Sequence, residues 1–377
     1  MLITEGQTEF LVPDKTVEKF PPPKQEVFFN PEMEFNRDLT IALISTFVED
    51  EMSYLDAHGA TGVRGIRVKN EIPKTNVTIN DLSKSAYKFM KKNKERGNFD
   101  VTLRNVDSSL LMLQNKYDII DLDPYGSPVS FLDPASKSIK RNGLICVTAT
   151  DTAPLCGAHQ NSGLRKYGSK ILNTSYHKES GCRALVSKLI KTAAQYDKQY
   201  IPLLTYYDSH YFRSFGQIKK GAKKSDKALK KLGYIYHCTN CGNRKIKTGT
   251  VPLIKNKRCR CGNKFTGTGP FYLDNLNKTK FLKKINKNLK NLKLNTKQKI
   301  TETLNLLIQE TNLPPTFYDI HKTCKKLSIT APKNQKVLKE LREKGYKATK
   351  THFNNVGIKT NADLQEFKKT LKNLTKN

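Results

Sequence analysis

The 377-residue sequence lacks any run of about 18 apolar residues, the length that a membrane-spanning helix needs. Its first residues, MLITEG, lack the basic stretch and apolar core of a secretory signal. Eight cysteines are too few for a disulfide scaffold in a chain of this length. These absences exclude a membrane protein and predict a cytoplasmic one, in which clustered cysteines bind a metal.

Acidic residues are also scarce, because 34 Asp and Glu stand against 67 Lys and Arg, for a net charge of +33. The imbalance is strongest in residues 278–377, which carry 24 basic and 7 acidic side chains. A field of this sign attracts polyanions. Nucleic acid is therefore the expected partner, and no protein partner is indicated. The 16 Tyr and 17 Phe suffice for folded cores.

Residues 38–148 alternate strand-like apolar runs with helical stretches, which predicts an α/β domain with a mostly parallel, Rossmann-like sheet. We expect helices from about 38 to 48, with Asp38 as N-cap, and from Ser83 to Arg96. Strands are expected at 54–57, 77–79, 99–103, 117–122 and 144–148. A helix at 181–196 and paired strands within 201–215 follow.

The composition changes past residue 215, where lysines crowd a short stretch. The predicted domains are a Rossmann-like domain with an N-terminal extension (1–215) and a basic RNA-binding region (216–377). Residues 280–299 suit a linker or an exposed helix. Helical spacing within 301–350 predicts a smaller basic α+β, winged-helix-like C-terminal domain.

The motif Asp121-Leu122-Asp123-Pro124-Tyr125-Gly126 follows an apolar strand, at the edge where open α/β sheets place their sites. An exocyclic amine on a base is a poor nucleophile because its lone pair is delocalised into the ring. The Asp123 carboxylate and the Pro124 carbonyl can accept its N–H groups and localise that pair. Tyr125 can stack on the base. The motif therefore favours methylation of an amino group, although it also suits a tight turn.

The loop from Asp56 to Arg67, with Gly59 and Gly62, has the strand-turn-helix pattern of a nucleotide-cofactor site. It lacks both G-x-G-x-x-G and the phosphate loop, so S-adenosylmethionine (SAM) is favoured over nicotinamide cofactors and ATP. Asp81, after the second strand, can accept the ribose hydroxyls, and Asp107-Ser108 can meet the adenine. Arg37 and Arg67 are candidates for the methionyl carboxylate.

Cys238, Cys241, Cys259 and Cys261 lie on two glycine-containing turns within segment 236–264, a zinc-ribbon-like pattern. The second pair is C-x-C rather than C-x2-C. His237 is an alternative ligand, and such a zinc would be structural.

Together these residues resemble the archaeal SAM-dependent tRNA (guanine-26-N2)-dimethyltransferases. The similar stretches include Thr4-Glu5-Gly6, Asn36-Arg37-Asp38, the Asp56–Arg67 loop, Asp121–Pro128, Thr148–Gly157 and Gly357–Thr360. The resemblance implies that Arg37, Arg67, Asp81, Asp107 and Ser108 surround SAM, that Asp123, Pro124 and Tyr125 hold the guanine amine, and that Phe28 lines the pocket. It also implies tRNA as the partner. Tyr125 stands where Phe is common.

Two other functions stay open on the sequence. The same loop would serve another SAM-dependent amine methyltransferase, acting on a different RNA or DNA base. A non-catalytic RNA-binding protein with a degenerate cofactor fold would not need Asp81, Asp123 and Arg37 together. The sequence does not decide between addition of one methyl group and two.

Overall fold

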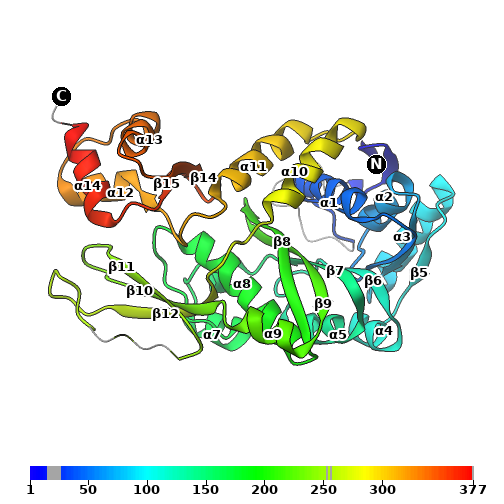
Figure 1. Ribbon diagram of the computed structural model, residues 1–377. Coiled ribbons are helices and arrows are strands. Elements are labelled where there is room, and N and C mark those ends of the chain that lie inside the picture. Colours follow the sequence, from blue (N-terminus) through cyan, green and yellow to red (C-terminus); the bar gives the residue numbers. More distant parts are fainter. Residues whose placement is uncertain (15–26, 252–253, 255–256, 376–377) are drawn as a thin grey trace. The chain divides into compact units, whose positions relative to one another are not determined.

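The computed structural model describes residues 1–14, 27–251, 254 and 257–375 (Figure 1). The chain forms two compact units from interleaved segments. Unit 1 contains Met1–Ala149, Phe215–Lys220 and Lys280–Leu304, and unit 2 contains Thr150–Ser214, Gly221–Thr279 and Asn305–Asn377. Each unit therefore takes segments from both sides of residue 215, where the sequence predicts one contiguous boundary. No helix in the described ranges is long and apolar enough to cross a membrane.

Unit 1 is built on a parallel sheet whose strand order is β5-β4-β3-β6-β7, and the last residues of β9 (Tyr211–Lys220) extend it beyond β7. The parallel strands are β3 (Met52–Asp56), β4 (Thr75–Asn80), β5 (Thr102–Arg104), β6 (Tyr117–Leu122) and β7 (Ile139–Ala149). β3 and β6 are mostly buried, as strands covered on both faces require. The predicted Rossmann-like sheet is confirmed.

Helices connect these strands and cover the sheet (Figure 1). They are α1 (Glu34–Phe47), α2 (Val63–Glu71), α3 (Lys84–Gly97), α4 (Ser108–Gln114) and α5 (Val129–Ser138). α2 contacts β3 and β4, and α5 contacts β6 and β7. Ser83 caps α3 as predicted, because its side chain accepts the N–H of Ala86. A short antiparallel hairpin, β1 (Leu2–Glu5) and β2 (Thr8–Leu11), precedes the sheet.

Asp38 is not the N-cap of the first helix, and that prediction is wrong. α1 begins at Glu34, so Asp38 lies inside it and is buried. Its carboxylate instead accepts hydrogen bonds from the backbone N–H and hydroxyl of Thr296, at 2.9 and 2.8 Å. It also pairs with Arg67 at 2.7 Å. An acidic residue that serves two distant partners is indistinguishable from a cap in the sequence alone.

Residues 279–310 form two helices, α10 (Thr279–Asn288) and α11 (Lys297–Glu310), joined by a short 3-10 turn. Of the two predicted alternatives, a linker or an exposed helix, the segment is helical, and it is anchored by apolar side chains. Leu282 and Ile285 of α10 are fully buried. The polar face of the segment also makes specific contacts, since Asn288 donates to the hydroxyls of Ser45 and Thr46 in α1.

Unit 2 begins with α6 (Thr152–Leu155), α7 (Gln160–Tyr167) and α8 (His177–Ala194), followed by strand β8 (Lys198–Asp208), which pairs with β9. Helix α9 (Ala222–Leu229) leads into a three-stranded sheet of order β11-β10-β12. Its strands are β10 (Leu232–His237), β11 (Arg244–Thr248) and β12 (Thr266–Tyr272). β10 pairs antiparallel with both neighbours, and the turn after it carries the first two clustered cysteines.

The C-terminal part of unit 2 is the predicted small α+β fold. A sheet of order β13-β15-β14 combines β13 (Tyr318–Asp319), β14 (Ala348–Thr351) and β15 (Asn354–Thr360). Three helices accompany it: α12 (Ile320–Leu327), α13 (Asn334–Glu343) and α14 (Leu364–Asn373). Their apolar sides meet in one core that includes Ile320, Leu341 and Phe367, all fully buried. This is the winged-helix-like module expected from residues 301–350.

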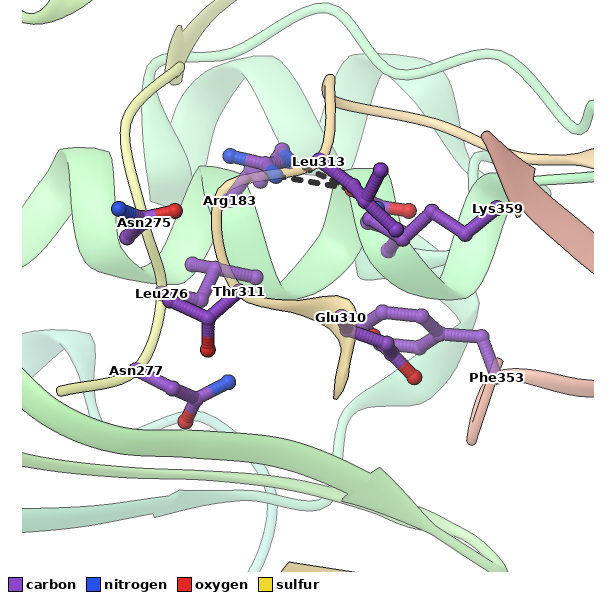
Figure 2. Close-up of a pocket in the computed structure, with 10 residues that line it drawn as sticks. Arg183, Asn275, Leu276, Asn277, Glu310, Thr311, Leu313, Phe353 and Lys359 are labelled. Atoms are coloured by element: carbon purple, nitrogen blue, oxygen red, sulfur yellow. Dashed lines mark hydrogen bonds and ion pairs between the residues drawn. The ribbon is translucent and has the colours of Figure 1, made fainter. Parts of the chain in front are cut away.

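A buried ion-pair cluster joins this module to α8 (Figure 2). Glu179 of α8 accepts hydrogen bonds from Lys359 Nζ at 2.6 Å and from the backbone N–H of Thr316 at 2.9 Å. Arg183, one turn along α8, pairs with the same carboxylate at 2.9 Å. Although burial raises the pKa of Glu179, Lys359 and Arg183 lower it to about 2. The adjoining cavity of about 20 Å³ has room for about one water molecule.

Candidate active site and metal centre

The order in which the chain adds strands to the parallel sheet of unit 1 reverses between β3 and β6. β4 and β5 extend the sheet on one side of this point, and β7 extends it on the other. Open α/β sheets bind ligands at the carboxyl ends of the two strands that flank such a reversal. Asp56 ends β3 and is register partner to Asp121 near the end of β6. Both are buried. The Asp121–Gly126 motif therefore begins at the position where the topology places a site.

Asp56 is held within this edge rather than facing solvent. Its Oδ2 accepts the N–H of Gly65 at 3.1 Å. Burial raises the pKa of Asp56 to about 7, and the neighbouring charge of Asp121 acts in the same direction. The Asp56 carboxylate thus fixes the first turn of α2, which follows the loop after β3.

Asp123 lies just beyond the end of β6 and forms an ion pair with Arg64. Arg64 comes from the first turn of α2 and is itself buried. Its Nη1 donates to Asn36 Oδ1 at 3.0 Å and to Thr40 Oγ1 at 3.1 Å, both on α1. A guanidinium fixed by α1 therefore fixes the position of the Asp123 carboxylate. Sequence reasoning missed Arg64 because only the fold brings α2 next to the end of β6.

The aromatic residues of the predicted pocket present open faces. Tyr125 is 96% exposed and Phe28 is 49% exposed, whereas Pro124 is buried. Gly126 has φ of +86°, a left-handed conformation that turns the chain sharply after Tyr125. The two rings lie in the segments predicted from the sequence to form the pocket, and their faces are free of protein contacts over much of their area. This geometry suits stacking on a planar ligand.

The first loop contacts two of the residues predicted to bind SAM. The N–H of Ala60 donates to Asp81 Oδ2 at 2.9 Å. Ser108 Oγ lies 3.3 Å from His58 Nε2, and the His58 ring packs on Phe131 with centroids 4.4 Å apart. The ends of β3, β4 and β5 thus converge around this loop. Gly62 is the N-cap of α2 and has φ of +80°, a left-handed conformation that favours glycine at this position.

Asp107 serves as the N-cap of α4, where Oδ1 accepts the N–H of Leu110 at 3.0 Å. This places it directly before Ser108, at the carboxyl edge of the sheet. Asp81 similarly accepts the N–H of Ser83 through Oδ1. Asp107 uses one oxygen atom for its cap, and Asp81 uses each of its two oxygens for one N–H. Both carboxylates keep part of their acceptor capacity, since a carboxylate offers about four lone-pair sites.

Arg37 and Arg67 share one carboxylate, that of Glu5. Arg37 Nε donates to Glu5 Oε2 at 2.7 Å, and Arg67 Nη1 lies 3.1 Å from the same oxygen. Arg67 is fully buried and also pairs with Asp38 at 2.7 Å and Glu71 at 2.8 Å. The cluster ties the N-terminal hairpin to α1 and α2. The predicted contact of the two arginines with SAM stays a prediction.

The four clustered cysteines meet at one point of unit 2. One Sγ atom from each of Cys238, Cys241, Cys259 and Cys261 lies within 4.8 Å of the others. Each pair lies on a tight turn, where the N–H of Gly242 donates to Cys238 O and that of Gly262 to Cys259 O, both at 2.9 Å. His237 Nδ1 instead lies 3.1 Å from the Tyr176 hydroxyl. Four thiols so arranged fit the tetrahedral ligation that zinc takes.

Comparisons with known proteins agree with this geometry over almost the entire chain. A family model described as "N2,N2-dimethylguanosine tRNA methyltransferase" matches residues 6–372. The tRNA (guanine(26)-N(2))-dimethyltransferase of Methanobrevibacter smithii is 39% identical, covering 99% of this chain and 97% of its own. The chain belongs to the N2,N2-dimethylguanosine tRNA methyltransferase family.

A solved structure of this tRNA methyltransferase family has the same fold. The complex of Trm1 from Pyrococcus horikoshii with S-adenosyl-L-methionine superposes with a TM-score of 0.88 at 37% identity. The match covers 98% of this chain and 99% of that one. The methyltransferase fold inferred from strand order and the fold of a SAM-bound relative are therefore the same.

Proposed function

We propose that this family member transfers methyl groups from SAM to the exocyclic amine of guanine 26 in tRNA. The observation that carries the proposal is the position of Asp123-Pro124-Tyr125 after β6, at the carboxyl edge where the strand order reverses between β3 and β6. Asp123 is fixed there by Arg64. The family match over residues 6–372 supports the substrate. Addition of a second methyl group is part of the proposal, since the amine retains one hydrogen after the first transfer.

Asp123 and Pro124 are the proposed hydrogen-bond acceptors for the amine. A carboxylate and a carbonyl on its two N–H groups localise the nitrogen lone pair and direct it toward the methyl donor. Tyr125 and Phe28 supply exposed ring faces for the base. Catalysis then comes mainly from positioning. Asp123 accepts the proton that the amine loses.

The residues at the carboxyl ends of the strands fit SAM by their donor and acceptor types. We place the ribose hydroxyls at Asp81 and the adenine amine at Asp107 and Ser108. The methionyl carboxylate is placed near Arg37 and Arg67 of α1 and α2, where it would compete with Glu5 for their donors. The cofactor supplies an electrophilic methyl group on a sulfonium. His58 and Phe131 form an apolar and aromatic wall beside Ser108.

Guanine 26 must leave its stack to reach Asp123, at a cost of a few kcal/mol. We propose that the basic region from residue 216 onward offsets this cost through contacts to the RNA backbone. The cytoplasmic location stays a prediction from the sequence. A zinc ion held by the four cysteines would fix the turns of segment 236–264 and take no part in the transfer.

The test is methyl transfer from labelled SAM to an unmodified tRNA transcript, followed by mass spectrometry of the digested nucleosides. We expect N2-methylguanosine and N2,N2-dimethylguanosine, with no product from a matched transcript that carries adenine at position 26. Asp123→Asn should remove most activity while SAM binding, measured by calorimetry, stays intact.

Three other outcomes would correct the proposal. Label in the transcript with adenine at position 26 would move the site to another base. SAM binding without label in any tRNA would indicate a different nucleic-acid substrate. Failure to bind SAM would favour the non-catalytic RNA-binding alternative.

A further inference from the structure

Unit 2 contains a second cavity, between the first cysteine turn and helices α12 and α14. Its volume is about 120 Å³, and four of its lining side chains are cationic: Arg244, Lys322, Lys326 and Lys368. Asp319 is the single acidic residue of the lining. We name this cavity the Arg244 pocket. It lies entirely within unit 2 and outside the methyl-transfer site.

The one carboxylate of the Arg244 pocket is already used by the fold. Asp319 caps α12, where Oδ1 accepts the N–H of Lys322 at 2.8 Å. Its Oδ2 accepts the side-chain N–H of Asn354 at 3.1 Å. Within the described part of the chain, none of the four cations forms an ion pair. The cations of the lining therefore outnumber its one carboxylate, and this excess attracts an anion.

Arg244 is held in place before any ligand arrives. Its guanidinium lies over the ring of Tyr318 at 4.3 Å and that of Tyr176 at 4.7 Å. Its Nη1 donates to the carbonyl of Phe317 at 2.9 Å. Its Nε is buried and has no acceptor among the described residues. Buried N–H groups without a partner are rare and call for an explanation.

Lys326 is also positioned, because its Nζ donates to the carbonyl of Asn240 at 2.6 Å. That carbonyl lies in the turn between Cys238 and Cys241. Lys322 lies in the first turn of α12, the helix that also carries Lys326. Lys368 lies in α14. Three elements thus direct positive charge into one cavity.

The chemistry of the pocket selects a phosphate group. A guanidinium and ammonium groups together match a tetrahedral oxyanion. The rings of Tyr318 and Tyr176 are already covered by Arg244, so they are not free to stack on a base. Lys322, Lys326 and Lys368 belong to residues 278–377, which carry 24 basic and 7 acidic side chains. This surrounding excess favours a polyanion over a free phosphate.

We propose that the Arg244 pocket binds a backbone phosphate of tRNA, independently of nucleotide sequence. The proposal rests on the proposed function for its choice of RNA. It assigns unit 2 one defined point of contact with the RNA backbone in addition to a diffuse positive field.

The test compares two triple variants in tRNA binding across a range of salt concentrations, without SAM. Lys322→Ala, Lys326→Ala and Lys368→Ala together empty the pocket of ammonium groups. Lys223→Ala, Lys224→Ala and Lys227→Ala remove the same charge from exposed positions on α9 of the same unit. We expect the pocket variant to raise the Kd about 10-fold and to lower the salt slope by about one for each phosphate that it no longer binds.

The α9 variant should change both quantities much less. Equal effects of the two variants would overturn the proposal that the Arg244 pocket binds a phosphate, and would leave only a diffuse positive field. A double variant, Lys322→Ala with Lys368→Ala, keeps the hydrogen bond between Lys326 and Asn240, so it tests the pocket even where the triple variant unfolds. Thermal midpoint and SAM affinity, both expected to be unchanged, check the fold.

The outcome is separable from that of methyl transfer. If tRNA is methylated at guanine 26, the pocket variant should raise the KM for tRNA about 10-fold and leave kcat unchanged. If no methylation occurs, loss of salt-sensitive RNA binding in the pocket variant alone still supports the pocket. Tight binding of inorganic phosphate by calorimetry, with unchanged tRNA affinity in the variant, would reject the RNA backbone as ligand.

Discussion

The ion pair between Arg64 and Asp123 gives the sharpest test of the proposed mechanism. Arg64→Gln removes the cation that fixes Asp123 and keeps a polar, uncharged side chain, which is too short to reach Asn36 and Thr40 as Nη1 does. The Asp123 side chain is only 18% exposed, so water replaces the missing cation incompletely. A hydrogen bond to a charged group contributes about 1.5–3 kcal/mol. This corresponds to a loss of about 10- to 150-fold in kcat/KM.

A double-mutant cycle separates positioning from other effects of Arg64. If Arg64 acts through Asp123, then Arg64→Gln in an Asp123→Asn background should cost little more than Asp123→Asn alone. Steady-state methyl transfer to tRNA provides the rates, and calorimetry provides the SAM affinity of each variant.

Fully additive losses in the cycle would refute the reasoning. Such additivity would mean that Arg64 contributes through an interaction that does not involve Asp123. A thermal midpoint measured for each variant controls for the second role of Arg64, which lies 3.9 Å from the buried carboxylate of Asp121.

Three further predictions concern stability. Arg67→Met leaves Glu5, Asp38 and Glu71 without their shared cation, and should lower the free energy of urea unfolding by about 3–5 kcal/mol; a change in SAM affinity alone would instead favour direct contact with the cofactor. Removing zinc with a chelator should lower the thermal midpoint of the wild type but not that of Cys238→Ser, and equal shifts in both would argue against the site. Glu179 has a lowered folded-state pKa of about 2, so its stabilising contribution is present above pH 4.5 and is lost as the pH falls toward 2. Acid unfolding of Glu179→Gln should therefore have a shallower pH dependence in that range, and identical profiles would contradict the pairing.

The sequence predicted most reliably those elements whose signal is local. Strand β6 was expected at 117–122 and is found there, because four of its six residues, Tyr117, Ile119, Ile120 and Leu122, are large and apolar. The Ser83 cap was likewise visible in the sequence. The motif after β6 could be proposed as a site because its chemistry is contained in consecutive residues, and its role stays a prediction.

Long-range pairing explains what the sequence did not predict. Arg64 contacts Asp123 across 59 positions, and Asp38 contacts Thr296 across 258. Neither pair has a spacing that any helix or strand period would reveal. Residues 280–299 left a linker and an exposed helix open because lysine and asparagine dominate, and the buried side chains of Leu282 and Ile285, which anchor α10, could not be identified. A few buried positions thus decided the structure of a mostly polar segment.

The interleaving of the two units has a consequence for synthesis of the chain. Unit 1 needs Phe215–Lys220 and Lys280–Leu304 in addition to its first 149 residues. At roughly 5–20 residues per second, a ribosome takes on the order of 10–30 seconds to proceed from Ala149 to Leu304. β7 lacks its neighbour β9 until Lys220 has been made, and the groups on α1 that bind α10 lack their partner for most of the interval. The nascent methyltransferase core therefore exposes first an open strand edge and then unpaired polar groups on α1, a period in which a chaperone would be useful.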